Sequence, residues 1–269
     1  MKKLLVIAEI FLFSSVLLHA QGELDEQQKA FFRNEKSVGI LLNTDGIGVS
    51  YRSAKRIDFL NKRLWEIDAG TLKHPKEYRQ PNLYNQGGSF IFGKLNSTFF
   101  LRGGIGHQHE LFRKTDLGGI AVRYFYSFGP VLAIYKPIYY KVIYYQWINP
   151  TQFVPYEKEE KFDVSIALPQ DIAGKASFTK GLNEIKAMPG LYAKGGFNFE
   201  YSKEDKVIHA VEIGAQINAF PKVIPIMANT DNKAIFFSLF VSYRFGMIIN
   251  PLDPESNKIS NIFRRKKKN

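Results

Sequence analysis

The chain of 269 residues contains no cysteine and only five histidines and two tryptophans. Without cysteine it can form neither a disulfide nor a thiolate metal site, and it cannot be a lipoprotein anchored through an N-terminal cysteine. An exported protein without cysteine suits a bacterial envelope.

Long apolar runs are missing except at the N-terminus. A positively charged start, residues 1–3, precedes an apolar stretch, 4–18, and Ala20 stands at a suitable cleavage position. This pattern predicts a secretory signal peptide over 1–20. The stretch contains Glu9 and is short for a spanning helix, and no later run reaches about 18 apolar residues. We therefore do not expect a helical membrane protein.

Acidic residues are outnumbered, with 25 Asp and Glu against 37 Lys and Arg, which gives a net charge of +12. Much of the excess lies in a tail, 247–269. On an exported chain such a tail favours anionic lipid or an acidic partner over nucleic acid, and a solvated tail without partner is the alternative. The residues predicted to dock a periplasmic partner are Ile262, Phe263, Arg264, Arg265, Lys266, Lys267 and Lys268.

The segment 235–245 alternates with a period of two. One face carries Phe237, Leu239, Val241, Tyr243 and Phe245, and the other carries Ser238, Ser242 and Arg244. An apolar face that ends in spaced aromatic residues near the end of a chain is typical of the closing strand of an outer-membrane β-barrel. Tyr243 and Phe245 are then the candidates for an assembly signal.

The whole chain predicts an all-β protein, an antiparallel transmembrane up-and-down β-barrel over 37–246 with a closed polar lumen. We expect eight strands, with ten as the alternative, at 38–52, 64–72, 96–111, 118–127, 131–146, 191–201, 208–220 and 234–245. Phe128-Gly129-Pro130 is interpreted as a turn and Pro137 as a bulge or interruption.

Alternation also sorts charges onto one face of these strands. That face carries four acids and four bases, namely Glu66, Asp68, Glu200, Glu212, Arg102, Arg123, Lys194 and Arg244. A narrow barrel of eight strands is just wide enough to be filled by side chains, and buried charges must be paired. We therefore expect a lumen closed by ion pairs and no open pore.

Period two alone does not distinguish inside from outside, and a soluble ligand-carrying barrel would show the same alternation with the opposite sign. An aromatic segment, 135–147 with five tyrosines and one tryptophan, favours the membrane because such residues suit a headgroup boundary. We expect both termini in the periplasm, an N-terminal arm over 21–36 and a large extracellular loop over 147–190. The connection 74–95 is too long for the periplasmic turn that this strand count requires.

Chemistry-bearing clusters are few. His107 and His109 point the same way, near the expected extracellular rim, and form a weak metal candidate for which a polar rim pair is the alternative. No histidine has a serine at a spacing that forces proximity, so we predict no catalytic residue and no cofactor. A lipid hydrolase or acyltransferase at the membrane surface stays an alternative.

As a whole the chain resembles small outer-membrane barrels of the kind typified by outer-membrane protein A. Four phrases resemble those of an uncharacterised outer-membrane barrel family of the Bacteroidota, namely Leu42-Asn43-Thr44-Asp45-Gly46, Lys73-His74-Pro75-Lys76-Glu77, Gly93-Lys94-Leu95-Asn96-Ser97 and Pro225-Ile226-Met227-Ala228. The resemblance implies a location and a barrel but no catalytic residues. The chain departs from the usual pattern because about 23 residues follow Gly246.

These observations lead to a hypothesis of function. We expect a non-enzymatic barrel that acts as a structural or accessory subunit of an outer-membrane complex for protein assembly or secretion. Its expected partners are outer-membrane lipids, lipopolysaccharide and other envelope proteins, and not nucleic acid. A small-solute channel is the main alternative.

Overall fold

The computed structural model describes residues 34–82, 89–114, 118–150, 152–163, 168–202, 206–228 and 231–249. The predicted signal peptide and most of the arm and the tail lie outside these residues. The barrel strands are β1 (Asn34–Asn43), β2 (Gly46–Arg56), β3 (Asn61–Leu72), β6 (Asn96–Phe112), β7 (Ala121–Pro137), β11 (Lys186–Glu200), β12 (Val207–Ala219) and β13 (Ile235–Ile249).

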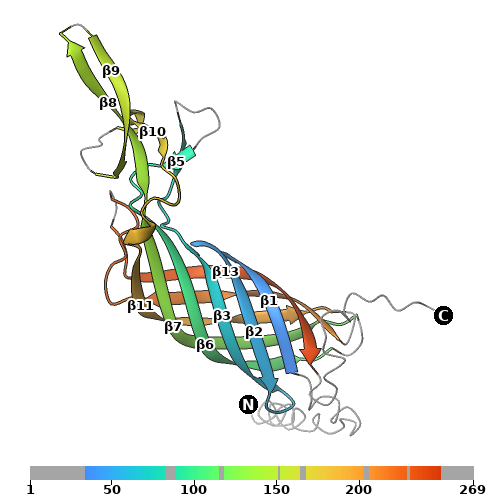
Figure 1. The fold of residues 1–269 in the computed structure, drawn as a ribbon. Coiled ribbons are helices and arrows are strands. Elements are labelled where there is room, and N and C mark those ends of the chain that lie inside the picture. The colour runs from blue at the N-terminus through green and yellow to red at the C-terminus, as the bar shows by residue number, and fades with distance from the viewer. Residues whose placement is uncertain are drawn as a thin grey trace, which may run out of the picture.

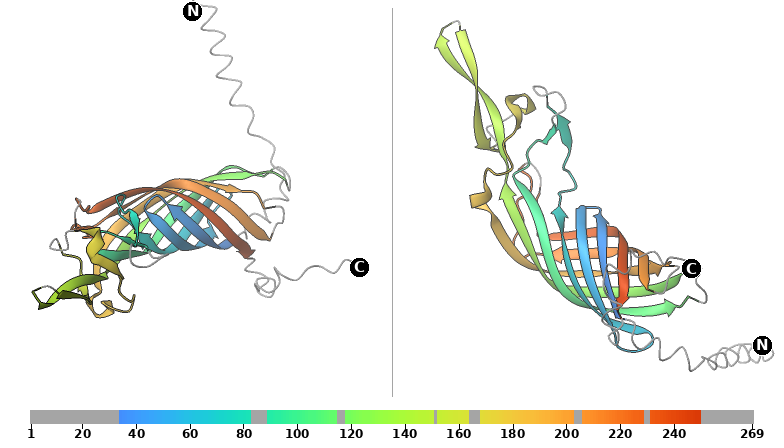
Figure 2. Two further views of the ribbon diagram at one scale, coloured as in Figure 1. Left: turned by 90° about the horizontal axis from the view of Figure 1, so that it is seen from above. Right: turned by 45° about the vertical axis from the view of Figure 1, so that its right-hand side comes forward.

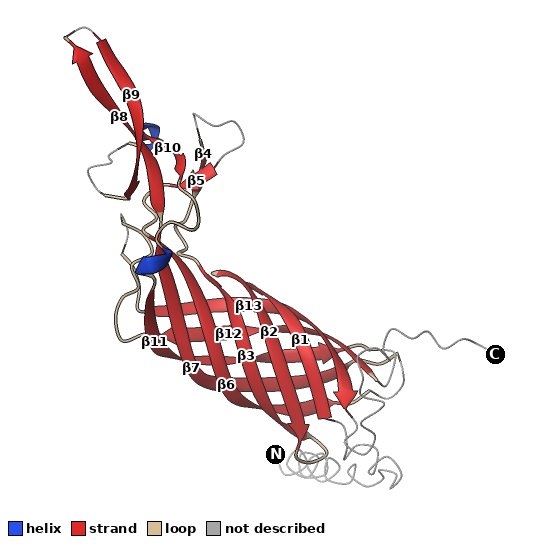
Figure 3. Cartoon of the chain, viewed as in Figure 1, coloured by secondary structure: helices blue, strands red, loops and turns tan. Residues whose placement is uncertain are grey.

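These strands close into an antiparallel barrel in the order β1-β13-β12-β11-β7-β6-β3-β2 (Figures 1 and 3). The first and last strands pair along the whole length of β1, from Asn34 opposite Ile249 to Asn43 opposite Phe240. The fold class and the strand number of eight predicted from the sequence are confirmed. Within the described residues, no helix is long and apolar enough to cross a membrane.

Two errors in the predicted strands compensate for one another. The single strand expected over 38–52 is a hairpin, because the chain turns at Thr44 and Asp45 between β1 and β2. The two strands expected over 118–127 and 131–146 contribute only one strand to the barrel, because β7 runs through Gly129 without a turn. One strand gained and one lost leave the number at eight.

Gly129 marks a close approach between strands. A Cβ atom at this position would lie 2.2 Å from the carbonyl oxygen of Gly103 on β6. The glycine therefore allows the backbones of β6 and β7 to pack closely at a lumen-facing position, and the predicted turn is wrong. Pro137 ends β7, and the chain beyond it leaves the barrel.

The end of the barrel where β1 begins and β13 ends is called here the terminal end, and the opposite end the loop end. The terminal end holds the connections 57–60, 113–120 and 201–206, and the loop end holds 44–45, 73–95, 138–185 and 220–234. The connection after β3 therefore joins the other long connections. The sequence interpretation placed this connection at the periplasmic end because it counted the β1–β2 hairpin as a single strand.

Several predicted boundaries shift. The barrel begins at Asn34 and not at residue 37, and β13 continues to Ile249, three residues into the predicted tail. The large loop expected over 147–190 covers 138–185, because β8 begins outside the barrel and β11 begins at Lys186.

Two small sheets lie at the loop end. One contains β8 (Tyr139–Asn149), β9 (Gln152–Lys161) and β10 (Ile172–Lys175), and the other contains β4 (Arg79–Pro81) and β5 (Ser89–Ile91). Two 3₁₀ turns, η1 (Pro169–Asp171) and η2 (Leu182–Glu184), complete this region. The hairpin of β8 and β9 projects away from the barrel in all views (Figures 1 and 2).

Burial alternates along the barrel strands. On β13 the side chains from Ile235 to Phe245 alternate between exposed and buried. The outward positions are all apolar or aromatic, and the inward positions carry Ser238, Ser242 and Arg244 together with Phe236 and Phe240. The outer face of this strand is therefore apolar, and its inner face is of mixed character. The Tyr-rich segment is an exception to the predictions: Tyr135 is buried inside the barrel mouth and Tyr140 in the base of the hairpin, so the segment does not form a girdle.

Candidate functional site

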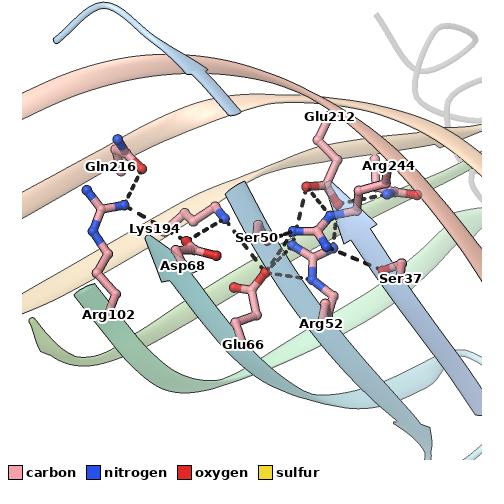
Figure 4. A network of polar contacts seen from close by, with 11 residues as sticks. Ser37, Ser50, Arg52, Glu66, Asp68, Arg102, Lys194, Glu212, Gln216 and Arg244 are labelled. Carbon is pink, nitrogen blue, oxygen red and sulfur yellow. Dashed lines mark hydrogen bonds and ion pairs between the residues drawn. The ribbon is translucent and has the colours of Figure 1, made fainter. Parts of the chain in front are cut away.

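The centre of the barrel interior holds two carboxylates between two arginines (Figure 4). Glu212 on β12 accepts hydrogen bonds from Arg52 and, at 2.8 Å, from Nε of Arg244. Glu66 on β3 accepts from Nε of Arg52 at 2.6 Å and from Arg244 at 3.2 Å. Each guanidinium thus bridges both carboxylates, which compensates the cost of burying these charges.

A second group continues this network towards the loop end. Nζ of Lys194 on β11 lies 3.2 Å from Oδ2 of Asp68 and 3.7 Å from Oε1 of Glu66. Arg102 on β6 lies 3.9 Å from Asp68 and donates to Oε1 of Gln216 at 2.6 Å. The network therefore spans the lumen from β3 to β12 (Figure 4).

A separate set of ion pairs lies nearer the terminal end. Arg123 on β7 contacts Glu200 at 2.5 Å and Glu35 at 3.9 Å, and Lys62 donates to Glu35. Lys114 reaches Glu200 at 3.1 Å from the connection after β6. Buried apolar side chains, namely Leu41, Ala54, Leu64, Phe125 and Phe240, pack among these charges, with the guanidinium of Arg52 4.4 Å from the ring centroid of Phe125.

The loop end of the lumen is closed by apolar side chains, called here the loop-end plug. The plug combines lumen-facing residues of the barrel with residues of the loop-end connections, namely Leu72, Ile91, Phe100, Val131, Ala133, Tyr135, Tyr192, Phe220, Ile224, Ile226, Met227 and Phe236. The ion pairs lie below the plug, in a barrel of eight strands whose interior is just wide enough to be filled by side chains.

The structure places all eight predicted charged residues in the barrel interior, and each of them takes part in an ion pair. Sequence reasoning missed Arg52, Glu35 and Lys62. An Asp-Gly pair between alternating segments is a hairpin signal, and Asp45-Gly46 carries it here. Recognising it would have restarted the alternation at Gly46 and placed Arg52 inside.

The predicted assembly signal lies on the outer face at the terminal end. Tyr243 and Phe245 are 43% and 36% exposed. Nδ1 of His209 lies 2.8 Å from the hydroxyl of Tyr243, and its ring packs edge-on against Phe245. These side chains form an aromatic cluster on the outer wall. The basic run of the tail, Ile262 to Lys268, lies outside the described residues.

His107 and His109 lie on the outer face, as expected, but at the other end of the barrel. They belong to the half of β6 nearest the terminal end, because β6 runs away from the loop end. The extra strand in the β1–β2 hairpin reverses the direction that the sequence interpretation gave to this segment. Each ring lies beside a tyrosine of β7, and Nδ1 of His109 contacts Asn61 at 2.7 Å. No group of three or more metal-ligating side chains occurs in the described part of the chain.

The four phrases singled out in the sequence meet at the loop end. The backbone N–H of Lys73 donates to Asp45, Leu95 donates to Ile226 at 2.8 Å, and Ala228 donates to Gly93. The segments 73–77, 93–97 and 225–228 are called here the loop-end cap, and the last of them contributes Ile226 and Met227 to the plug. They connect the barrel mouth to the projecting hairpin.

The hairpin of β8 and β9 exposes large aromatic side chains. Tyr145, Trp147 and Phe153 are 55%, 64% and 50% exposed, and the ring of Phe153 contacts the other two edge-on. Their register places them on one face of the hairpin. This surface is called here the hairpin aromatic face.

The free edge of β9 is a poor site for pairing with another strand. Pro155 lacks a backbone N–H, and the charged run from Glu157 to Lys161 follows it. Proline and charges on an edge strand are devices that oppose edge-to-edge association. The hairpin therefore presents its aromatic face, and not its edge, for contacts.

The base of the hairpin is fastened by exposed polar contacts. Glu184 of η2 accepts hydrogen bonds from Lys161 and from the hydroxyl of Tyr139, which hold the pKa of the Glu184 carboxyl below its usual range. The same hydrogen bond raises the pKa of Tyr139. A further contact buries Tyr140, whose hydroxyl donates to the carbonyls of Ile91 and Lys94 at 2.7 and 2.9 Å.

Comparison with known proteins gives structural similarity only. No protein-family model matches the chain, and no curated protein matches its sequence. Similar solved structures include Ail, the attachment invasion locus protein of Yersinia pestis, with 5% identity, 81% of this chain and 99% of that chain covered and a TM-score of 0.38.

Two more solved structures are similar. Neisserial surface protein A has 9% identity, with 80% of this chain and 96% of that chain covered and a TM-score of 0.34. The N-terminal β-barrel domain of Pseudomonas aeruginosa OprF has 7% identity, with 81% and 98% covered and a TM-score of 0.32. Similarity at this level transfers no property of those proteins to the chain. The resemblance to a family of the Bacteroidota stays a prediction.

Proposed function

We propose that the chain is an outer-membrane β-barrel that anchors a projecting hairpin for contact with a protein partner, as an accessory subunit of an outer-membrane complex. The observation that carries this proposal is the combination of a lumen filled by side chains and an exposed aromatic face on a hairpin that leaves the barrel.

The membrane part of the proposal follows from the outer face. Apolar side chains cover that face from Ile235 to Phe245 on β13, a span of eleven residues. At about 3.3 Å per residue and a tilt near 45°, this span covers about 25 Å along the barrel axis, the height of the apolar band in outer-membrane barrels. A soluble ligand-carrying barrel would need the opposite arrangement, with polar side chains on the outer face and apolar side chains inside.

The lengths of the connections support the orientation. Outer-membrane barrels have short periplasmic turns and longer extracellular loops. The terminal end holds only the short connections, the longest being 113–120, whereas the loop end holds 73–95 and 138–185. We therefore place both termini in the periplasm and the hairpin outside the cell.

The interior supports a role without conduction or catalysis. The apolar plug and the ion pairs lie across the lumen of a narrow barrel, which weighs against the channel. Among the described residues, no histidine side chain hydrogen-bonds a serine hydroxyl: His74 contacts the backbone, His109 contacts Asn61 and His209 contacts Tyr243. A lipid-modifying enzyme has no supporting arrangement in this part of the chain.

The hairpin aromatic face supports a protein partner. Contiguous exposed apolar side chains on a soluble element mark interaction sites, and Trp and Tyr are enriched in protein interfaces. Tyr145, Trp147 and Phe153 are exposed on β8 and β9, the hairpin that projects beyond the barrel (Figure 1). A partner would remove this surface from water.

The experiment compares the partners of the wild-type protein with those of a Trp147→Ser/Phe153→Ser variant. Both are extracted from outer membranes in mild detergent, and co-purifying proteins are quantified by mass spectrometry. We expect a stoichiometric partner with the wild type and its loss with the variant. Tyr78→Ser, which removes an exposed aromatic residue outside the hairpin, should keep the partner.

A third variant distinguishes partner binding by the hairpin from partner binding by the basic tail. Deletion of 262–269 should release a periplasmic partner if the tail docks one, independently of the hairpin. A wild-type protein that purifies alone, or a hairpin variant that keeps every partner, would contradict the role of the hairpin. Absence of the protein from the outer-membrane fraction would contradict the whole proposal.

A further inference from the structure

The outer face at the terminal end carries a compact patch of cations. Lys55 on β2 lies directly opposite Arg63 on β3, and Lys36 on β1 lies opposite Ser53 on β2. Ser53 in turn lies opposite Trp65. All five side chains point outwards by the alternation of their strands, and the three cations are exposed.

The spacing within this patch is short. Side chains directly opposite each other in an antiparallel pair have Cβ atoms about 4.5–5.5 Å apart, and diagonal neighbours are about 7–8 Å apart. Lys55 is therefore a direct neighbour of Arg63 and a diagonal neighbour of Lys36. Like charges placed directly opposite destabilise a sheet unless an anion lies between them.

No acidic side chain of the described residues provides that anion. Glu35, the neighbour of Lys36 in the chain, points into the lumen and pairs with Lys62. Asp58, in the turn between β2 and β3, accepts hydrogen bonds from the backbone of Leu60 and from Asn61. The counter-charge for the patch must come from outside this part of the chain.

The position of the patch indicates what that anion is. Lys55 and Arg63 lie within three residues of the terminal ends of β2 and β3, and Trp65, which is 61% exposed, lies on the side towards the apolar band. Trp in such a place sits at the depth of the lipid headgroups. Arginine binds phosphate oxygens with two parallel hydrogen bonds, and lysine adds a point charge.

We propose that Lys36, Lys55 and Arg63, with Ser53 and Trp65, bind the phosphate of an anionic phospholipid in the leaflet at the terminal end. The inference rests on the proposed function, because it requires the barrel to span a membrane. The guanidinium of Arg63 and the ammonium of Lys55 hold the phosphate oxygens, and Trp65 packs against the glycerol region.

The experiment reconstitutes the full chain into nanodiscs of phosphatidylcholine, with and without a minor fraction of phosphatidylglycerol. We expect phosphatidylglycerol to raise the thermal unfolding midpoint of the wild type by about 2–4 °C, the shift typical of one added ionic contact in a chain of this size. High salt should abolish the rise because it screens exposed charges. Native mass spectrometry should find phosphatidylglycerol retained on the wild type.

The test variant is Lys55→Gln/Arg63→Gln, and the control is Lys141→Gln/Lys158→Gln, which makes the same charge change at exposed lysines of the hairpin away from lipid. The test variant should lose both the midpoint rise and the retained lipid, and the control should keep both. An unchanged rise in the test variant would overturn the inference. A wild type that inserts without responding to phosphatidylglycerol overturns the inference alone, and a wild type that inserts into neither nanodisc overturns the proposed function with it.

Discussion

At the scale of residues, the barrel interior depends on carboxylates that serve two partners each. Glu212 neutralises Arg52 and Arg244 and also accepts from Nδ2 of Asn198 at 2.8 Å. The guanidinium of Arg52 lies 4.4 Å from the ring centroid of Phe125, so part of its charge faces an aromatic ring. Such a network links five of the eight barrel strands, because its members come from β2, β3, β11, β12 and β13.

Two adjacent glycines of β6, Gly103 and Gly104, lie on opposite faces of the strand and have different surroundings. A Cβ atom at Gly104 would lie 2.2 Å from the hydroxyl of Tyr192 and 2.6 Å from the carbonyl oxygen of Phe128. A Cβ atom at the adjacent Gly103, on the outer face, would meet nothing within 4 Å. An alanine substitution changes the backbone freedom in the same way at both positions but adds a steric clash only at Gly104. The difference between the two variants therefore measures the packing of the interior.

We expect Gly104→Ala to lower the free energy of unfolding by about 1–3 kcal/mol, because the added methyl group overpacks a lumen position beside a rigid backbone. Gly103→Ala should change it little. The measurement is urea unfolding of both variants in lipid vesicles, followed by tryptophan fluorescence. Equal destabilisation at the two positions would contradict the assignment of Gly104 to the filled interior.

At the scale of elements, the sequence determined which face of each strand looks inwards but not where two of the strands begin and end. Period-two alternation is set by side-chain burial, so the inner positions Glu66, Arg102 and Glu212 could be predicted. The β1–β2 hairpin was missed because both of its strands are apolar on the outside and only a short turn separates them. Besides Asp45-Gly46, the reversal is marked by a change of phase, because Ile40 and Leu42 point outwards before the turn and Ile47 and Val49 after it.

The departure of β8 from the barrel was not predictable from alternation. Residues 139–146 continue the aromatic character of β7, so the sequence pattern predicts that they continue the barrel strand. Their environment is decided by distant segments: the Tyr140 hydroxyl binds the carbonyls of Ile91 and Lys94, and its ring packs edge-on with Phe90 and Phe162. A single sequence does not record such long-range contacts.

The hydrogen bonds of the Tyr140 hydroxyl predict how the sheet of β8, β9 and β10 is held at the loop end. Tyr140→Phe removes the donor to two carbonyl oxygens, and an unsatisfied buried acceptor costs about 1–3 kcal/mol. We expect faster hydrogen exchange in β8, β9 and β10 while the barrel strands keep their protection. Tyr145→Phe, on the exposed hairpin aromatic face, serves as the control and should leave exchange unchanged. Faster exchange across the whole barrel would mean that Tyr140 supports more than the hairpin.

At the scale of the whole molecule, the interior combines an apolar end with ionic groups further along the barrel. The apolar plug lies at the loop end, the central network of Arg52, Glu66, Glu212 and Arg244 follows, and the ion pairs of Arg123 and Lys62 lie towards the terminal end. A polar interior alone would be compatible with a channel. The plug is what opposes conduction, because hydrated ions would have to pass a cluster of mainly apolar side chains.

The apolar plug predicts no conductance. Purified wild-type protein added to a planar bilayer should give a current at the level of the protein-free membrane, across the voltages and salt concentrations at which porins conduct. Insertion must be verified independently, by recovering the protein in the membrane fraction of vesicles made under the same conditions. Discrete, reproducible current steps from inserted protein would show that the plug or the ion pairs open. This result would contradict the proposed anchor and support a small-solute channel. A current at the level of the protein-free membrane would instead support the proposal that the barrel anchors the hairpin of β8 and β9.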